Sequence, residues 1–270
     1  IPSPSPSAPM TALARPASDP LCPLEQLRLA REVVRTEGQT LLALADRLGE
    51  EFCHAVALLR VTNGSVIVSG MGKAGLIGQK VAATFASTGT RSHFLHPAEA
   101  IHGDLGRVHR EDVALILSFS GQTEEVTRIL PALAELGVAI IAITGRTDSP
   151  LAKAAAITLD LGAITEACPH GLAPTASTTA MLALGDALAL VLSNMRGFSP
   201  ADFAKFHPGG NLGRKLSRIE EVMRPLSQCR VARSSQTLRE TLVTQSRPGR
   251  RTGAIMVDRK STRLNSSHRT

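Results

Sequence analysis

A glycine-rich stretch at residues 69–75 (SGMGKAG) follows a short β-branched run and precedes a helical pattern. Glycines let backbone N–H groups approach a ligand closely, and the start of a helix attracts anions through its free N–H groups and its dipole. Lys73 adds a cation. The stretch therefore predicts a phosphate or sugar site, with Ser69, Gly70 and Gly72 among its contacts.

The same glycines match the dinucleotide fingerprint GxGxxG through Gly70, Gly72 and Gly75, so a nicotinamide or flavin enzyme is an alternative. That fingerprint expects an acidic residue about twenty positions further on. His96 and Pro97 occupy this place, and the acidic residue Glu99 falls only in the following loop. The spacing therefore argues against a dinucleotide.

A second polar stretch, residues 118–125 (SFSGQTEE), follows the apolar run VALIL and opens another helical pattern. The hydroxyls of Ser118, Ser120 and Thr123, together with the helix N-terminus, predict a cradle for a dianionic phosphate. The alternative is an ordinary Ser/Thr helix cap with glutamate in the first turn.

Both stretches need an element that places them side by side. Five β-branched runs, at residues 65–70, 92–95, 112–118, 139–144 and 156–161, alternate with helical patterns that include residues 74–87 and 124–136. Because parallel strands require long crossovers, which are usually helices, the order predicts an α/β protein with a doubly wound, five-stranded parallel sheet. Ligands bind such sheets at the carboxyl ends of the strands, where both stretches lie.

Other patterns flank this region. Residues 24–59 have helical spacing interrupted near Gly38, which predicts one long helix or two stacked ones, and residues 175–195 form another long Ala/Leu-rich helix. The residues after 219 resemble the opening of a second module, with GAIMV at 253–257 as its strand. The predicted domains are a disordered tail at 1–20, a main domain with N-terminal helices at 21–216, a partial module at 217–258, and a disordered or foreign tail at 259–270.

The second polar stretch, combined with the glycine-rich stretch and five strands, resembles the sugar isomerase (SIS) domain family; the matching residues are Ser118, Ser120, Gly121, Thr123 and Glu125. Further stretches are similar to the arabinose 5-phosphate isomerases within that family: STGT (87–90), HPAEAIHGDLG (96–106), residues 166–189, and FHPGGNLGRKL (206–216). The resemblance implies interconversion of D-ribulose 5-phosphate and D-arabinose 5-phosphate, towards 3-deoxy-D-manno-octulosonate for lipopolysaccharide or capsule. It also implies a homotetramer and a tandem CBS pair, of which IEEVMRP (219–225) would be the start.

The resemblance implies roles for individual side chains. Glu166 is the preferred base and Glu125 a second acid–base group, while Lys73 would stabilise an enediolate and His207 would open the ring or move oxygen protons. His102 and Thr175 would contact the sugar. The chain departs from the family at Ala74, usually serine, and at residues 119–122 (FSGQ), commonly Asn-Ser-Gly-Glu.

Two alternatives remain. SIS domains also serve as sugar-phosphate sensors in transcription regulators, but those have an N-terminal helix-turn-helix module and only a short helical region precedes Val66. Four histidines, His93, His96, His102 and His207, could form a metal site if folding joined them. The resemblance suggests that such a metal inhibits, so we expect no catalytic metal and no organic cofactor.

The composition of the chain argues against some classes of binding partner. The net charge of +7 is concentrated towards the C-terminal end, and the chain has only 3% aromatic residues with no Trp or Tyr, which disfavours nucleic acid. No export signal or uninterrupted apolar run of spanning length occurs, so no membrane is expected. The four cysteines are scattered, which fits reduced thiols in a cytoplasm.

Overall fold

The computed structural model describes residues 21–207, 219, 223, 229, 231–244 and 256–258. The chain divides into two compact units, Ile1–Phe203 and Ala204–Thr270. The helices are α1 (Pro23–Arg47), α2 (Glu50–Val61), α3 (Gly72–Ser87), α4 (Pro97–Ile101), α5 (Glu124–Glu135), α6 (Pro150–Ala154), α7 (Ala176–Met195), α8 (Pro200–Phe206) and α11 (Leu238–Thr244), with a 3-10 turn η1 (Asp104–Arg107).

The first unit contains the predicted sheet. Its strands are β1 (Val66–Gly70), β2 (Ser92–Leu95), β3 (Val113–Leu117), β4 (Ala139–Thr144) and β5 (Ile157–Asp160), all parallel and in the order β2-β1-β3-β4-β5. The prediction of a doubly wound, five-stranded parallel sheet is therefore confirmed. The connection from β2 to β3 passes to the other side of β1, so the winding reverses between β1 and β3.

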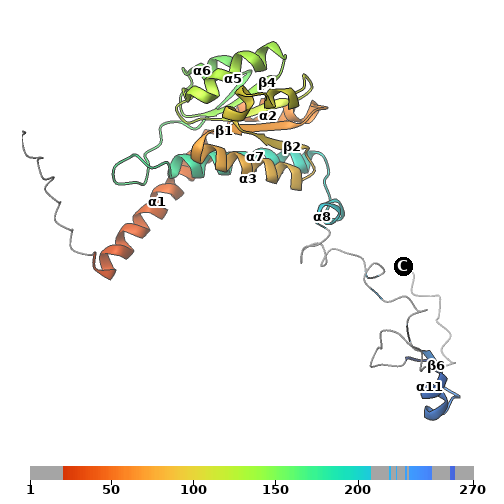
Figure 1. The fold of residues 1–270 in the computed structure, drawn as a ribbon. Coiled ribbons are helices and arrows are strands. Elements are labelled where there is room, and N and C mark those ends of the chain that lie inside the picture. The colour runs from red at the N-terminus through yellow and green to blue at the C-terminus, as the bar shows by residue number, and fades with distance from the viewer. Residues whose placement is uncertain are drawn as a thin grey trace, which may run out of the picture. The chain divides into compact units, whose positions relative to one another are not determined.

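The sheet lies between two layers of helices, with α5 and α6 on one side and α3 and α7 on the other (Figure 1), and alternate residues of its strands belong to two different cores. In β1, Val66 and Val68 join the core that includes residues of α2, α3 and α7, whereas Ile67 joins the core formed with α4, α5 and α6. β3 is buried along its whole length. Both faces of the central strands are thus covered, which explains why they consist of continuous apolar runs.

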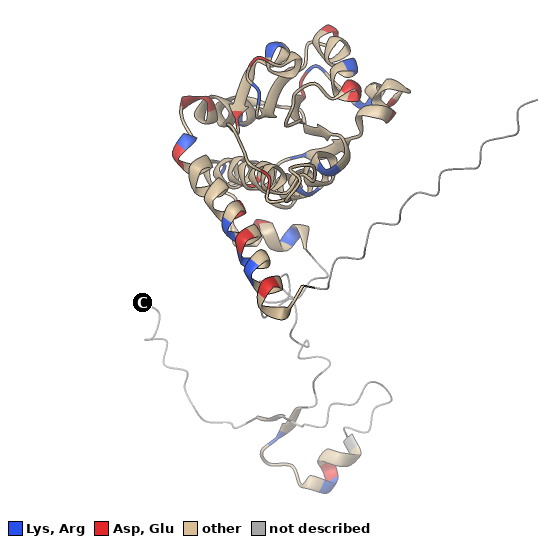
Figure 2. Ribbon diagram, turned by 90° about the vertical axis from the view of Figure 1, so that its left-hand side faces the viewer, with Lys and Arg blue, Asp and Glu red and all other residues tan. Residues whose placement is uncertain are grey.

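The N-terminal helical pattern forms two helices. Their break lies at Leu48 and Gly49 rather than near Gly38, the point at which the sequence pattern was interrupted. Gly38 lies inside α1 in open space, with nothing within 4 Å of an added Cβ, so the glycine is tolerated at a cost of about 1 kcal/mol. Along α1, acidic and basic side chains alternate (Figure 2), and Arg28 pairs with Glu25 and Glu32.

By length and composition α7 alone, among the described residues, could cross a membrane. However, 56% of its most apolar window is buried inside the chain, and it packs against α1, α2 and α3. A close approach to α3 requires Gly185, because a Cβ there would lie 2.5 Å from Val81. These contacts are those of a core helix.

The second unit contains β6 (Val231–Arg233) and β7 (Met256–Asp258), paired in parallel, together with α11. Residues 256 and 257 of the predicted strand GAIMV belong to β7, and residues 253–255 lie outside the described residues. The tails at 1–20 and 259–270 also lie outside them. The CBS-like module at 217–258 stays a prediction.

Candidate functional site

The two polar stretches meet at one place on the sheet. β1 and β3 are neighbours, and their last residues, Gly70 and Leu117, are register partners. A Cβ on Gly70 would lie 3.0 Å from the Leu117 carbonyl oxygen, so glycine is needed for this approach. The stretches that follow these strands therefore leave the sheet together at its switch point, where parallel sheets bind ligands.

The glycine-rich stretch turns sharply from β1 into α3. Gly72 has a φ of +58°, a conformation that favours glycine. A Cβ on Gly75 would lie 2.6 Å from the Gly70 carbonyl oxygen, so this glycine lets α3 begin directly against the strand. Ser69 is buried and donates its hydroxyl to the Leu95 carbonyl at 2.8 Å. Its side chain thus already ties β1 to β2.

Lys73 lies in the first turn of α3 and is exposed. Within the part of the chain that the structure describes, it has no hydrogen bond or ion pair. The N-cap residue Met71 offers no side-chain cap to α3. A cation and free helix N–H groups are therefore both available to an anion.

The loop between β3 and α5 is closed by its own hydroxyls. The hydroxyls of Ser118 and Thr123 are 3.0 Å apart, and the backbone N–H of Gly121 donates to the Ser118 hydroxyl at 3.1 Å. Gln122 N–H donates to the Ser120 hydroxyl at 3.3 Å. The N-cap residue Thr123 makes no side-chain cap bond to α5. The ordinary-cap alternative is therefore wrong here, and the start of α5 remains open.

Gly121 allows this closure. Its φ is +60°, and an added Cβ would lie only 2.1 Å from the Ser149 hydroxyl oxygen. Its carbonyl also accepts from Leu151 N–H at 3.1 Å. The loop therefore packs against the start of α6, and this contact fixes its conformation.

The two glutamates that begin α5 differ. Glu124 is exposed and pairs with Arg128 at 2.6 Å. Glu125 is partly buried and has no hydrogen bond or ion pair within the described part of the chain. Neither carboxylate oxygen of Glu125 is therefore occupied by a group in that part of the chain.

Glu166 lies on the connection from β5 to α7 and holds the start of that helix. Its Oε2 accepts from Thr175 N–H at 2.7 Å, the Thr175 hydroxyl at 3.0 Å and Ser177 N–H at 3.3 Å. Partial burial raises the pKa of Glu166, but the hydrogen bonds from Ser177 and Thr175 together outweigh it and leave the pKa below its usual range. The Glu166 carboxylate is thus fixed and ionised.

The N-cap residue of α7, Thr175, makes no side-chain cap bond to its own helix. Its hydroxyl instead bonds to Glu166 and accepts from Ala167 N–H at 2.9 Å. A carboxylate nine residues before Thr175 replaces the local cap, a relation that only the folded loop reveals.

This connection leaves the same edge of the sheet as the β3–α5 loop. Leu161 N–H donates to the Thr144 carbonyl at 2.9 Å, and the Thr144 hydroxyl donates to the Phe119 carbonyl at 3.1 Å. A chain of hydrogen bonds thus joins the end of β5, the end of β4 and the loop after β3. Lys73, Glu125 and Glu166 all follow strand ends on this edge.

The histidines do not form a metal cluster in the described residues, where no three His, Cys, Asp or Glu side chains gather as possible ligands. His102 is exposed at the end of α4. His93 Nε2 and His96 Nδ1 are buried and have no hydrogen-bond partner among the residues that the structure describes. His207 belongs to the second unit, and residues 208–216 of its motif lie outside the described residues.

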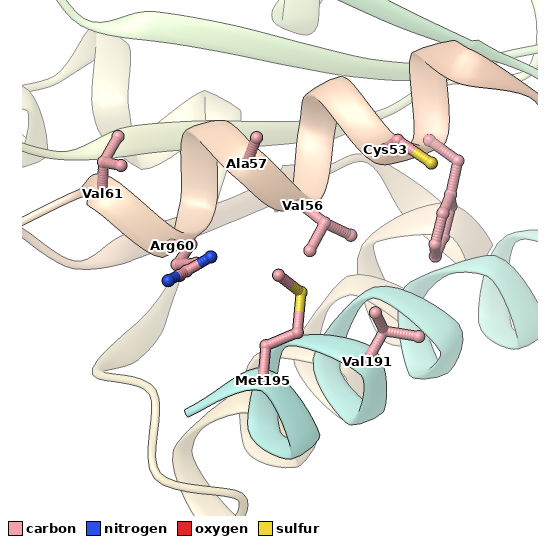
Figure 3. Close-up of a pocket in the computed structure, with 8 residues that line it drawn as sticks. Cys53, Val56, Ala57, Arg60, Val61, Val191 and Met195 are labelled. Carbon is pink, nitrogen blue, oxygen red and sulfur yellow. The ribbon is translucent and has the colours of Figure 1, made fainter. Parts of the chain in front are cut away.

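Two hollows lie elsewhere on the first unit. One, of about 540 Å³, lies between α2 and α7, where Val56 and Met195 face each other (Figure 3). The other, of about 430 Å³, lies between the α1–α2 junction and β5 and includes Arg47 and Asp160. Neither is lined by a residue of the polar strand ends after β1 and β3.

Comparisons with known proteins agree with this geometry. The SIS domain matches residues 58–191. The chain is 48% identical to a probable arabinose 5-phosphate isomerase of Haemophilus influenzae, covering 72% of this chain and 57% of that protein. It is 50% identical to arabinose 5-phosphate isomerase KdsD of Pseudomonas aeruginosa, covering 74% and 62%. A solved structure, that of E. coli CFT073 c3406 in complex with arabinose 5-phosphate, is 38% identical with a TM-score of 0.68, covering 70% of this chain and 100% of that one.

Proposed function

The chain belongs to the SIS domain family, and we propose that it is an aldose–ketose isomerase that interconverts D-ribulose 5-phosphate and D-arabinose 5-phosphate. The observation that supports this best is the meeting of two uncapped helix starts, α3 and α5, beside Lys73 and Glu125 at the β1–β3 switch point. The choice of sugar rests on the named relatives, of whose length the chain spans 57% and 62%.

The phosphate is proposed to bind at the start of α5. The Gly121 turn and the Ser118–Thr123 hydroxyl pair shape this loop, and Thr123 leaves the first N–H groups of the helix uncapped. These N–H groups, together with the exposed Ser120 hydroxyl, can donate to the phosphate oxygens. Ser69, Gly70 and Gly72 would line the neighbouring start of α3.

The reaction needs one proton to move between two carbons. From ribulose 5-phosphate, a base removes a proton from C1 while O2 gains one, which gives the 1,2-enediol. Return of the proton to C2, with loss of the O1 proton, gives the aldose. No redox cofactor is required by this scheme, because no net oxidation occurs, and acid–base groups alone can move the protons.

We place the base at Glu125 rather than at Glu166, which the sequence favoured. The carboxylate of Glu125 has no partner in the described residues, whereas one oxygen of Glu166 is held by three hydrogen bonds and the lowered pKa makes Glu166 a weaker base. Glu166 would instead orient the sugar through its other oxygen, Oε1. Lys73 would stabilise the negative charge that develops on the enediolate.

Three further roles remain proposals. His207 would open the cyclic sugar or move the oxygen protons, because imidazole can both donate and accept a proton. His102 and Thr175 would contact the sugar; the Thr175 hydroxyl, already bonded to Glu166, would do so together with that carboxylate.

The assembly is proposed to be a homotetramer in the cytoplasm, acting in lipopolysaccharide or capsule synthesis. The hollow between α2 and α7 supports self-association, since its lining is almost wholly apolar and Val61, Val191 and Met195 are exposed at its edge. Light scattering of the parent and of Val191→Glu would test this. The parallel β6–β7 pair with α11 is compatible with the partial CBS-like module.

The sensor alternative binds the sugar phosphate without converting it. The test is to incubate purified protein with ribulose 5-phosphate and follow formation of arabinose 5-phosphate by NMR, with Glu125→Gln as the matched variant. We expect turnover by the parent and its loss in the variant. Binding measured by calorimetry without any conversion by the parent would instead favour the sensor.

A further inference from the structure

Helix α1 buries few of its own side chains within the first unit. Of its 25 residues only Leu44 is buried. Two of its polar side chains nevertheless make specific contacts on either side of the segment 161–175 that bears Glu166: Glu37 with Thr179 in the first turn of α7, and Arg47 where the segment leaves β5.

The first contact joins α1 to the first turn of α7. The Thr179 hydroxyl donates to Glu37 Oε2 at 2.9 Å, and both residues are partly buried. Thr179 N–H in turn donates to the Thr175 carbonyl at 3.0 Å. Glu37 therefore bonds to the same helical turn whose N–H groups donate to Glu166.

The second contact lies where the segment leaves β5. The Arg47 guanidinium lies 3.6 Å from Asp160 Oδ2 and covers Gly162, where a Cβ would lie 2.5 Å from the central guanidinium carbon. Gly162 has a φ of +72°, and its N–H donates to Asp160 Oδ1 at 2.8 Å. An ion pair this exposed contributes little by itself. Its effect is to hold the backbone turn in place.

We propose that α1 positions Glu166 for the reaction, with Glu37 and Arg47 as positioning residues that act through the two ends of segment 161–175. This inference rests on the proposed function. A fixed carboxylate can orient a sugar only if the helix turn that holds it is itself fixed. Small displacements of such a group lower turnover strongly, because reacting atoms must be aligned closely.

The test compares Glu37→Ala and Thr179→Val, which remove the same hydrogen bond from opposite sides. Each is expected to lower kcat about tenfold or more with a much smaller change in KM. Glu37→Gln keeps an oxygen that accepts from Thr179 and is expected to restore kcat. Glu32→Ala is the matched control, since Glu32 is exposed on the same helix and pairs only with Arg28 in the described residues.

A double-variant cycle separates positioning from general loosening of the fold. If Glu37 acts through Glu166, adding Glu37→Ala to Glu166→Gln lowers kcat no further. If the two losses multiply, or if Glu37→Ala lowers only the melting temperature, α1 does not position Glu166 and the inference is overturned.

A second readout does not depend on turnover. Hydrogen–deuterium exchange in the full chain is expected to rise in residues 162–175 for Glu37→Ala and for Arg47→Ala, and to stay unchanged for Glu32→Ala. If the parent protein converts no pentose phosphate, the proposed function is wrong. Hydrogen–deuterium exchange would still show whether α1 stabilises residues 162–175. Unchanged exchange in both variants would overturn the inference for an active and an inactive parent alike.

Discussion

Glu166 Oε2 lies 2.7 Å from the backbone nitrogen of Thr175, across the loop that connects β5 to α7. A helix start is normally capped by a residue next to it. Here the cap is a carboxylate nine residues earlier, so the shape of the loop and the ionisation of Glu166 depend on each other.

Glu166→Gln should therefore change stability in a pH-dependent way. The pKa of Glu166 is lowered in the folded chain, so its ionised form stabilises the fold above the unfolded value of about 4.3. This contribution is lost as pH falls through the lower, folded pKa. Urea unfolding at a series of pH values should show the variant less stable by about 1 kcal/mol near neutrality, with the gap narrowing below about pH 5. A gap that is constant with pH would contradict the assignment.

Glu125→Gln tests the base directly. Because Glu125 has no partner in the described residues, the change should leave the melting temperature nearly unaltered. Loss of a general base should lower kcat by about 10²–10⁴-fold. Glu124→Gln, which removes the exposed partner of Arg128 one residue earlier, is the matched control and should retain turnover. Equal activity of the two variants would exclude Glu125 as the base.

Lys73→Ala should separate catalysis from folding in the same manner. Lys73 is exposed and unpaired within the described residues, so the free energy of unfolding should stay within about 0.5 kcal/mol of the parent. Loss of a charge that stabilises the enediolate should lower kcat by about 10²–10³-fold. Chemical denaturation and initial rates measured on one preparation check both parts, and a stability loss matching the rate loss would point to a structural lysine.

Gly121→Ala should damage the phosphate loop through two effects. A left-handed φ costs an alanine roughly 1–2 kcal/mol, and its Cβ would also collide with the Ser149 hydroxyl. Gly72→Ala is the control, since its φ is nearly the same but its Cβ would meet nothing within 4 Å. Unfolding experiments should show the larger loss for Gly121→Ala. Similar losses would mean that the Ser149 contact is unimportant.

Much of the first unit could be predicted because its signals are local. Continuous apolar runs such as VALIL specify strands buried on both faces, and helical patterns between them require parallel pairing. The break between α1 and α2 could not be located, because Gly38 resembles a helix end yet lies in open space where a glycine is tolerated.

The site was predicted only in part, for a similar reason. The location of the site at the polar strand ends could be predicted from the order of the strands, because open parallel sheets bind ligands at the carboxyl ends of their strands. The bond from Ser69 to the Leu95 carbonyl joins two strands, and the cap from Glu166 to Thr175 crosses a loop. Such pairs depend on strand order and loop path, which no local pattern encodes.

The uncapped starts of α3 and α5 have a consequence for how the substrate is used. In the proposed reaction the protein binds the phosphate group, which lies at the end of the substrate that does not react. The free energy of phosphate binding can offset the entropic cost of aligning C1 and C2 with the carboxylates. A pentose without its phosphate would therefore be converted slowly even at saturating concentration, and added phosphite should accelerate its conversion.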